Sequence, residues 1–353
     1  MIISIIIPTY NRAKSLDATL QSIHTVLSVS RFKNVEVLII DNGSTDDTKE
    51  ISMKWVTKIN TCKYIYETVP GLLSGRHRGA AEAKGEILCF VDDDVVLSPT
   101  WIDAIAETMY AKPDIQLMTG PILPKFETAA PEWINYFWSP APYGGKACIW
   151  LSLLHFDKKE QLVNANYIWG LNFTIRKITF HSLGGFHPDN IPKSLQHFQG
   201  DGETGLTIKA NEKNCKAWYH PDAMLYHQVA TSRLTYEYFD QRAFYQGVGN
   251  SYTAIRKLNG HYKNDFDTLK RKTINNLKST LMPAKEFIYQ KISGDKVPYS
   301  MQQLKKRFDA KEIEGYKFHQ ASFNESEIVR KWVLKENYFD YKLPLENDRE
   351  YKV

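Results

Sequence analysis

Three consecutive carboxylates, Asp92, Asp93 and Asp94, follow the apolar segment 86–91. Like charges this close repel one another unless a cation joins them, and Mg²⁺ and Mn²⁺ take oxygen ligands. A divalent cation held here could bridge the protein to a diphosphate and neutralise both sides. A solvated acidic turn before the next helix would explain the same residues. The cluster therefore predicts a site for Mn²⁺ or Mg²⁺, with a plain turn as the alternative.

A second isolated carboxylate, Asp41, ends the apolar segment 35–40 and precedes the turn sequence Asn42-Gly43-Ser44. A carboxylate accepts hydrogen bonds but cannot donate them, so it can select the imino N–H of a uracil or thymine ring. An aspartate that stabilises a turn or caps a helix would leave the same pattern. We therefore expect either a base-reading or a turn-stabilising role for Asp41.

The elements that position these carboxylates follow the alternation of strands and helices that is typical of a mostly parallel sheet. We expect strands at 2–7, 35–40, 63–67 and 86–91, and a helix opened by Ser98-Pro99 that runs to Met109. Open α/β sheets bind ligands at the carboxyl ends of their strands. Helical periodicity returns from residue 234 onward, after a loop-rich aromatic stretch.

Composition and charge exclude several classes of protein. The chain has 353 residues with 45 Lys and Arg against 40 Asp and Glu, a balance too mild to indicate nucleic-acid binding. The four cysteines are too far apart for a zinc cluster or a redox pair, which favours a reducing compartment. Because the first apolar run is short and has no cationic region before it, we expect no signal peptide and a cytoplasmic protein.

Four segments, in order, resemble the motifs of family 2 glycosyltransferases with the GT-A fold. They are residues 4–11 (SIIIPTYN), 37–46 (VLIIDNGSTD), 75–79 (GRHRG) and 85–94 (GEILCFVDDD). The resemblance covers about residues 1–250. It implies a Rossmann-like open mixed sheet with helices on both faces, followed by a mostly helical, basic C-terminal region.

The resemblance also divides the chain and assigns roles. Residues 1–125 would be the nucleotide-sugar-binding half, 126–233 the half that holds the acceptor and the catalytic base, and 234–353 a helical extension. Within the donor site, Asp41 would contact the base, Asp92 the ribose and Asp94 the metal ion, with Asp93 in the variable middle position. The nucleotide-binding residues that the resemblance implies are Pro8, Thr9, Tyr10, Arg12, Asp41, Arg76, Asp92 and Asp93, although Arg12 could equally be a surface residue.

The catalytic base has two candidates in the segment 200–206 (GDGETGL), which resembles the acidic motif of the family but departs from its usual Glu-Asp pair. Counting back from Leu206 places Glu203 on the base position, whereas counting forward from Gly200 favours Asp201. We prefer Glu203. Acidic residues that favour a helix N-terminus through its dipole would explain both without chemistry.

Three further assignments follow from the family pattern. His227 would complete the metal shell beside Asp94, although a lone histidine is often structural. Trp169, Gly170 and Asn172 would lie on the acceptor side, with Trp169 stacking on a sugar or simply packing in the core. The aromatic residues between 133 and 143 would line an acceptor groove or form a packing lid.

These inferences predict an enzyme that moves a sugar from a nucleoside-diphosphate donor, UDP or dTDP, to a hydroxyl of a glycan or lipid-linked saccharide, with inversion and with a divalent cation. The alternatives are a catalytically degenerate glycan- or nucleotide-binding module and a sugar nucleotidyltransferase. Residues 251–310 carry thirteen basic residues against five acidic ones. This excess suggests peripheral contact with an anionic membrane at its inner face, and solvated helices are the plain alternative.

Overall fold

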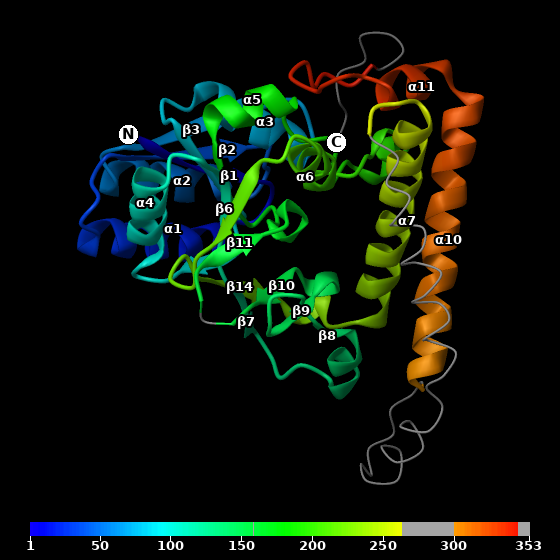
Figure 1. Ribbon diagram of the computed structural model, residues 1–353, viewed down its shortest axis with the longest axis horizontal. Coiled ribbons are helices and arrows are strands. Elements are labelled where there is room, and N and C mark those ends of the chain that lie inside the picture. Colours follow the sequence, from blue (N-terminus) through cyan, green and yellow to red (C-terminus); the bar gives the residue numbers. More distant parts are fainter. Residues whose placement is uncertain (158, 263–299, 345–353) are drawn as a thin grey trace.

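The computed structural model describes residues 1–157, 159–262 and 300–344. Its centre is a mixed eight-stranded sheet with helices on both faces (Figure 1). In spatial order its strands are β11 (Gln161–Val163), β13 (Lys216–Tyr219), β6 (Ile115–Thr119), β12 (Asn172–Arg176), β4 (Ile87–Val91), β1 (Ile3–Thr9), β2 (Val35–Asp41) and β3 (Cys62–Tyr66). The fold class expected from the sequence is confirmed.

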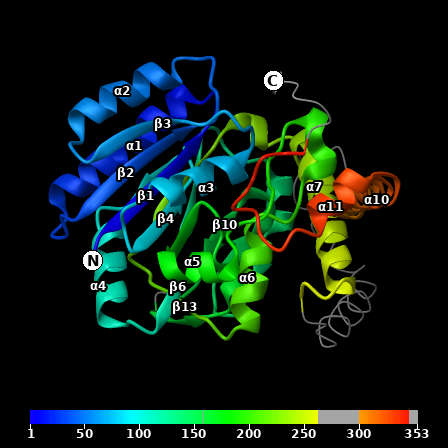
Figure 2. The same ribbon diagram turned by 90° about the horizontal axis from the view of Figure 1, so that it is seen from above.

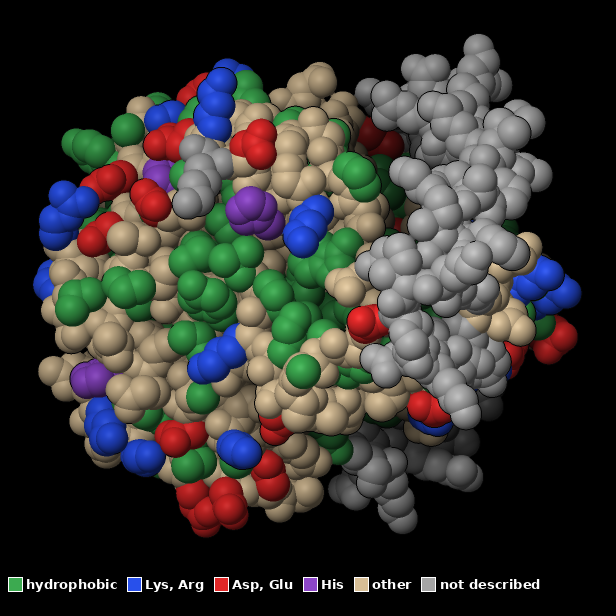
Figure 3. Space-filling model, turned by 90° about the horizontal axis from the view of Figure 1, so that it is seen from below, with side chains coloured by type: hydrophobic (Ala, Val, Ile, Leu, Met, Phe, Trp, Pro, Cys, Tyr) green, Lys and Arg blue, Asp and Glu red, His purple; other side chains and the backbone are tan. Residues whose placement is uncertain are grey.

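A second, six-stranded sheet lies beside the first. Its order is β5 (Val95–Leu97), β14 (Leu225–Val229), β7 (Ile122–Phe126), β10 (Leu153–His155), β9 (Lys146–Cys148) and β8 (Ser139–Pro140). Seen from below, hydrophobic side chains gather in the middle of this face with a few basic ones among them, and most acidic side chains lie towards its margin (Figure 3). Both sheets draw strands from residues 1–125 and from 126–233, so these two parts share one structural unit.

The helices are α1 (Ala13–Val29), α2 (Thr48–Lys58), α3 (Leu72–Glu82), α4 (Trp101–Ala111), α5 (Lys177–Leu183), α6 (Glu203–Glu212), α7 (Tyr236–Leu258), α10 (Met301–Glu325) and α11 (Glu327–Val333). Short 3₁₀ turns are η1 (Glu132–Phe137), η2 (Ile149–Leu151), η3 (Ala165–Tyr167), η4 (Lys193–Phe198) and η5 (Thr231–Arg233). Helices α7 and α10 lie side by side, at the opposite end of the molecule from α1 and α2 (Figures 1 and 2).

The central strands form because apolar, β-branched runs can be buried on both faces of a parallel sheet. All seven residues of β1 and all seven of β2 are buried. Strand β1 continues through Pro8 to Thr9, although we expected Pro8 to stop it. Pairing with β4 ends at Ile6, so the missing N–H of Pro8 falls beyond the ladder on that side. The parallel register places Thr9 beside Asp41, at one edge of the sheet.

Two expectations about local structure need correction. Helix α4 begins at Trp101, not directly after Ser98, because the hydroxyls of Ser98 and Thr100 both donate to the carbonyl oxygen of Asp222. The stretch after residue 124 is not only loop, since β12 inserts antiparallel between β4 and β6. Short strands of this kind lack the length and the alternation that make a strand visible in sequence.

The expected C-terminal helices are present as α7, α10 and α11. Helices α7 and α10 approach closely because each has a glycine at the contact. A Cβ on Gly247 would lie 1.9 Å from the carbonyl oxygen of Glu312, and one on Gly315 would lie 2.0 Å from that of Phe244. The basic stretch 251–310 falls largely on residues 263–299, outside the described residues. In the described part of the chain, no helix has the length and apolar character that a membrane span requires.

Candidate active site

The carboxyl ends of β1 and β4 meet at the three aspartates. The Thr9 hydroxyl donates to Asp93 Oδ2 at 2.7 Å, and Arg12 Nη1 donates to Asp93 Oδ1 at 3.0 Å and to Asp94 Oδ2 at 2.7 Å. Burial raises the pKa of Asp93 to about 6, helped by the negative charge of Asp94 and opposed by Arg12. The middle carboxylate therefore ties the loop after β1 to the loop after β4, and Arg12 is an ion-pair partner in this cluster.

Asp94 faces His227 in an arrangement that suits a metal ion. Arg233 Nη2 donates to Asp94 Oδ2 at 2.6 Å, and the same arginine donates through Nη1 to His227 Nε2, also at 2.6 Å. His227 Nδ1 lies 2.9 Å from the carbonyl oxygen of Leu151, which requires the proton on Nδ1 and leaves a lone pair on Nε2. Although burial opposes it, the neighbouring His227, and after it Arg233 and Arg12, hold the pKa of Asp94 well below the usual range.

Among the described residues, the buried Asp94 Oδ1 accepts no hydrogen bond, and it lies 3.5 Å from His227 Nε2. A buried carboxylate oxygen without a donor is poorly matched unless a cation reaches it. A cation between the two side chains would displace the N–H of Arg233 from the lone pair of His227 Nε2. The two side chains therefore fit a divalent cation with mixed nitrogen and oxygen ligands. In the described part of the chain no group of three or more such ligands is present, so further ligands would come from the diphosphate and water.

Asp41 supports the turn that follows it. Its Oδ1 accepts from the backbone N–H of Ser44 and its Oδ2 accepts from the Tyr64 hydroxyl, both at 2.8 Å. The residue is 1% exposed. These contacts are the turn-stabilising role left open by the sequence, and each oxygen keeps a further lone pair. Contact with a nucleotide base stays a prediction, as do the contacts of Pro8, which is buried, and Tyr10, which is exposed.

Arg76 links the aspartate cluster to the candidate base. Its Nη2 lies 3.3 Å from Asp92 Oδ1, and its Nη1 lies 3.5 Å from Glu203 Oε2. The guanidinium is almost fully buried and lies 5.1 Å from the ring centre of Phe186. The nucleotide contact expected for Arg76 stays a prediction. Its position between two carboxylates 111 residues apart in the sequence was not visible from the sequence pattern.

The two candidates for the base occupy different environments. Asp201 is almost fully buried and accepts from His187 Nδ1 at 2.7 Å, from the Thr253 hydroxyl at 2.8 Å and from the Tyr262 hydroxyl at 3.1 Å. Glu203, at the start of α6, is 27% exposed, and its Oε1 accepts the backbone N–H of Gly170 at 3.2 Å. Burial lowers the pKa of His187 to about 4, so it is a neutral donor to Asp201 at neutral pH. The geometry thus favours Glu203 as the available carboxylate.

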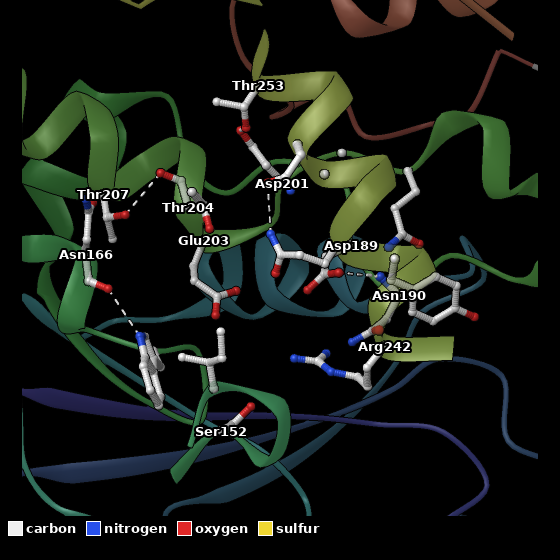
Figure 4. Close-up of a pocket in the computed structure, with 18 of the residues that line it drawn as sticks. Ser152, Asn166, Asp189, Asn190, Asp201, Glu203, Thr204, Thr207, Arg242 and Thr253 are labelled. Atoms are coloured by element: carbon white, nitrogen blue, oxygen red, sulfur yellow. Dashed lines mark hydrogen bonds between the residues drawn. The ribbon is translucent and has the colours of Figure 1, made fainter. Parts of the chain in front are cut away.

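Glu203 opens into a pocket of about 280 Å³ (Figure 4). Asp189, Glu203 and Arg242 point towards one another inside it. Burial and the nearby charge of Glu203 raise the pKa of Asp189 to about 6. Sequence reasoning missed Asp189 and Arg242. Asp189 comes four residues after the glycine pair Gly184-Gly185, whose turn was the one sequence signal near it.

The expected acceptor-side residues separate into two groups. Trp169 lines the pocket and donates from Nε1 to the carbonyl oxygen of Asn166 at 3.1 Å. Asn172 does not reach the pocket. It is fully buried, its Oδ1 accepts from Trp101 Nε1 and its Nδ2 donates to the carbonyl oxygen of Ala223. Both ends of its amide are satisfied within the core, so the expected acceptor contact of Asn172 is corrected to a structural role.

The aromatic stretch after residue 132 serves mainly as packing. The ring of Trp133 lies 4.8 Å from those of Tyr236 and Phe239, and the ring of Phe137 lies 5.5 Å from that of Phe308. These contacts fasten η1 to helices α7 and α10. This arrangement corresponds to the packing lid, one of the two roles that the sequence left open for these residues.

Comparison with known proteins gives the family of part of the chain. Residues 4–172 match the family model for glycosyl transferase family 2. Residues 4–172 therefore form a domain of glycosyltransferase family 2. The match ends at Asn172, so Asp189, Glu203 and Arg242 lie outside the residues that the family model covers.

Two relatives and one solved structure are similar to a larger part of the chain. A glucosyl-dolichyl phosphate glucuronosyltransferase of Haloferax volcanii is 20% identical over 255 residues, which are 70% of this chain and 75% of that protein. Glycosyltransferase AglE of the same organism is 27% identical over 186 residues, 52% of this chain and 55% of that protein. The mannosyltransferase PcManGT of Pyrobaculum calidifontis, solved with GDP-Man and Mn²⁺, aligns with a TM-score of 0.51 at 16% identity, over 96% of this chain and 84% of that one. The fold around the family 2 domain is GT-A.

Proposed function

We propose that the protein transfers a sugar from a nucleoside-diphosphate donor, with UDP or dTDP favoured, to a hydroxyl of a glycan or lipid-linked saccharide, with inversion at the anomeric carbon. One observation carries the proposal. Glu203, the available carboxylate of the pocket, is joined through Arg76 to Asp92, the first residue of the aspartate cluster. The guanidinium of Arg76 thus lies between the proposed acceptor side and the proposed donor side.

Glu203 acts as the general base in this proposal. Its carboxylate takes the proton of the acceptor hydroxyl while that oxygen forms a bond to the anomeric carbon, and the bond from that carbon to the diphosphate oxygen breaks on the opposite face. The Gly170 N–H and Arg76 orient the carboxylate, because they hold one oxygen each. A single displacement of this kind inverts the anomeric configuration.

The diphosphate leaves with growing negative charge, which the cluster around Asp94 would stabilise. Asp94 and His227 would hold a divalent cation there, and such a cation supplies charge neutralisation to the leaving diphosphate. Arg233 and Arg12 add positive charge at the same place because both donate to Asp94 Oδ2. The PcManGT structure contains Mn²⁺ and GDP-Man, which supports a nucleotide sugar and a divalent cation as the class of ligand.

The experiment that tests the base compares two neighbouring variants. Release of UDP from UDP-sugars, with and without acceptor glycans, is followed in the presence of Mn²⁺. Glu203→Gln should keep the affinity for UDP and lower turnover by about 10²–10⁴-fold, the usual contribution of a positioned general base.

Asp201→Asn is the matched control for that experiment. It should lower thermal stability, because a buried acceptor of three hydrogen bonds is weakened, while turnover at a permissive temperature falls less than in Glu203→Gln. If Glu203→Gln keeps the turnover of the unmutated protein, Glu203 is not the general base.

A further inference from the structure

One wall of the pocket is a single face of helix α7, which lies outside the matched family domain. Its residues recur at helical spacing and are Arg242, Tyr245, Gln246, Gly249, Asn250 and Thr253. Residues three and four apart lie on the same face of a helix. This polar face is half-buried, apart from the exposed Gln246, and it borders the same pocket as the candidate base. A polar helix face that lines a pocket is suited to a ligand rich in hydrogen-bonding groups.

The side chains that line the pocket carry more negative than positive charge. Three carboxylates line it, those of Asp189, Asp201 and Glu203, and Arg242 is the one cationic side chain among the described residues that line it. Asp201 is already held by three neutral donors, and Glu203 Oε2 is 3.5 Å from Arg76. The pocket therefore has no surplus positive charge with which to bind a phosphate or a carboxylate.

Arg242 is available to a ligand. Within residues 1–157, 159–262 and 300–344 it has no hydrogen-bond or ion-pair partner, although it points into the pocket near Asp189 (Figure 4). Among the residues that the structure describes, Asp189 Oδ1 accepts only from the backbone N–H of its neighbour, Asn190. A guanidinium donates hydrogen bonds and an ionised carboxylate accepts them, so the two side chains together can hold adjacent hydroxyl groups.

The pocket also offers a surface for the apolar face of a sugar ring. Trp169 lines it, and the bond from its Nε1 to Asn166 fixes the position of the indole. Ile149 and Ile168 are further apolar lining residues. The volume of about 280 Å³ is near the lower end of ligand pockets, which hold roughly 300–1,000 Å³. The space suits a small saccharide and not an extended lipid.

On the basis of the proposed function, we propose that this pocket takes an uncharged, hydroxyl-rich sugar ring as the acceptor, and that Asp189 excludes sugars bearing phosphate or carboxylate. Asp189 balances the charge of Arg242 and repels a second anion. Arg242 donates to the acceptor hydroxyls. The hydroxyl that reacts points to Glu203, while the rest of the ring lies between Trp169 and the polar face of α7.

The test uses three matched probes with the full-length protein in the presence of UDP and Mn²⁺. Methyl β-D-glucopyranoside is the neutral probe, and methyl β-D-glucuronide and glucose 6-phosphate are the anionic ones. Binding is measured by ligand-observed NMR titration. We expect the neutral probe to bind at least about tenfold more tightly than either anionic probe. A second negative charge placed next to Asp189 in a partly buried site lowers the affinity by roughly a factor of ten or more.

The substitution Asp189→Asn should reduce or remove this preference. It leaves Arg242 without a counter-charge, so the anionic probes should gain affinity by about tenfold. Adding Arg242→Gln to the same protein should remove that gain. Asp114→Asn, an exposed carboxylate paired with Lys216, is the control and should leave the order of the three probes unchanged.

The outcomes separate this inference from the proposed function. If UDP binds but the neutral and anionic probes bind equally, or if neither kind binds, the pocket assignment is overturned while the donor site stands. If UDP itself does not bind, the proposed function fails first. An unchanged preference in Asp189→Asn would also remove Asp189 from its selective role.

Discussion

Gly170 leaves the space that the guanidinium of Arg76 occupies. A Cβ at residue 170 would lie 2.2 Å from Arg76 Nη2. The same guanidinium stands between Asp92 and Glu203. The absence of a side chain at residue 170 therefore permits Arg76 to contact both carboxylates.

Gly170→Ala should consequently lower turnover strongly and the melting temperature only slightly. The added methyl displaces the arginine from two carboxylates, and hydrogen bonds to charged groups contribute about 1.5–3 kcal/mol each, so we expect turnover to fall by at least about tenfold. Steady-state kinetics and thermal unfolding check this. In an Arg76→Ala background the glycine substitution should add little, since both changes act on one contact; additive losses would contradict the explanation.

The metal assignment predicts a loss of nucleotide affinity. Asp94→Asn should weaken UDP binding in the presence of Mn²⁺ severely, because the charged oxygen ligand is lost. His227→Gln should do so less, since an amide keeps a neutral donor atom. Calorimetric titration with and without a chelator measures both. Asp46→Asn, which changes an exposed carboxylate near the same edge, is the control, and an Asp94→Asn protein that binds UDP and Mn²⁺ normally would exclude the assignment.

Base selectivity tests Asp41. Uracil carries a proton on N3 that a carboxylate can accept, whereas the corresponding nitrogen of cytosine is an acceptor. UDP should bind at least about tenfold more tightly than CDP, because an unpaired buried polar group costs about 1–3 kcal/mol. Asp41→Asn should narrow the ratio, since an amide can also donate. Thermal unfolding is recorded alongside, as Asp41 also holds Ser44 and Tyr64; equal UDP and CDP affinities in the unmutated protein would remove Asp41 from the donor site.

Buried histidines predict acid sensitivity. Burial lowers the pKa of His319, on α10, to about 4 from an ordinary value of 6.5. A folded-state pKa below the unfolded one means that the uncharged imidazole contributes stability above pH 6.5, and that this contribution is lost as pH falls through 4. Between pH 6.5 and 5 the loss is about 2 kcal/mol. Urea unfolding at several pH values should show a shallower dependence for His319→Gln than for His24→Gln, a partly exposed control on α1; equal slopes would contradict the prediction.

The sequence predicted those parts of the molecule that depend on local pattern. The strands ending at Thr9, Asp41 and Val91 were found within two residues of their ends, because long apolar runs bounded by turn residues carry their own signal. The sequence also left Asp201 and Glu203 as two candidates for the catalytic base. What separates them is contact with residues such as Thr253 and Tyr262, and that information lies in the tertiary structure alone.

Other parts of the site could not be read from the sequence. Arg233 and Asp94 are 139 residues apart, and no periodicity relates them. Asn172 matched a family motif, yet its amide was needed inside the core between Trp101 and Ala223. The polar face of α7 was the one signal within reach, since its spacing is helical, but a polar stripe on a helix normally indicates exposure to solvent.

The position of α7 separates two tasks along the chain. The aspartate cluster lies within residues 4–172, which match the family model, whereas one wall of the pocket comes from a helix that begins 64 residues after that match ends. Under the proposed function, substitutions on the pocket-lining face of α7 would alter which acceptor is used without touching Asp92, Asp93 or Asp94. A change of acceptor would then need new residues at only the six positions of this face, for protein engineering and for divergence between relatives alike, while the chemistry of the donor stays as it is.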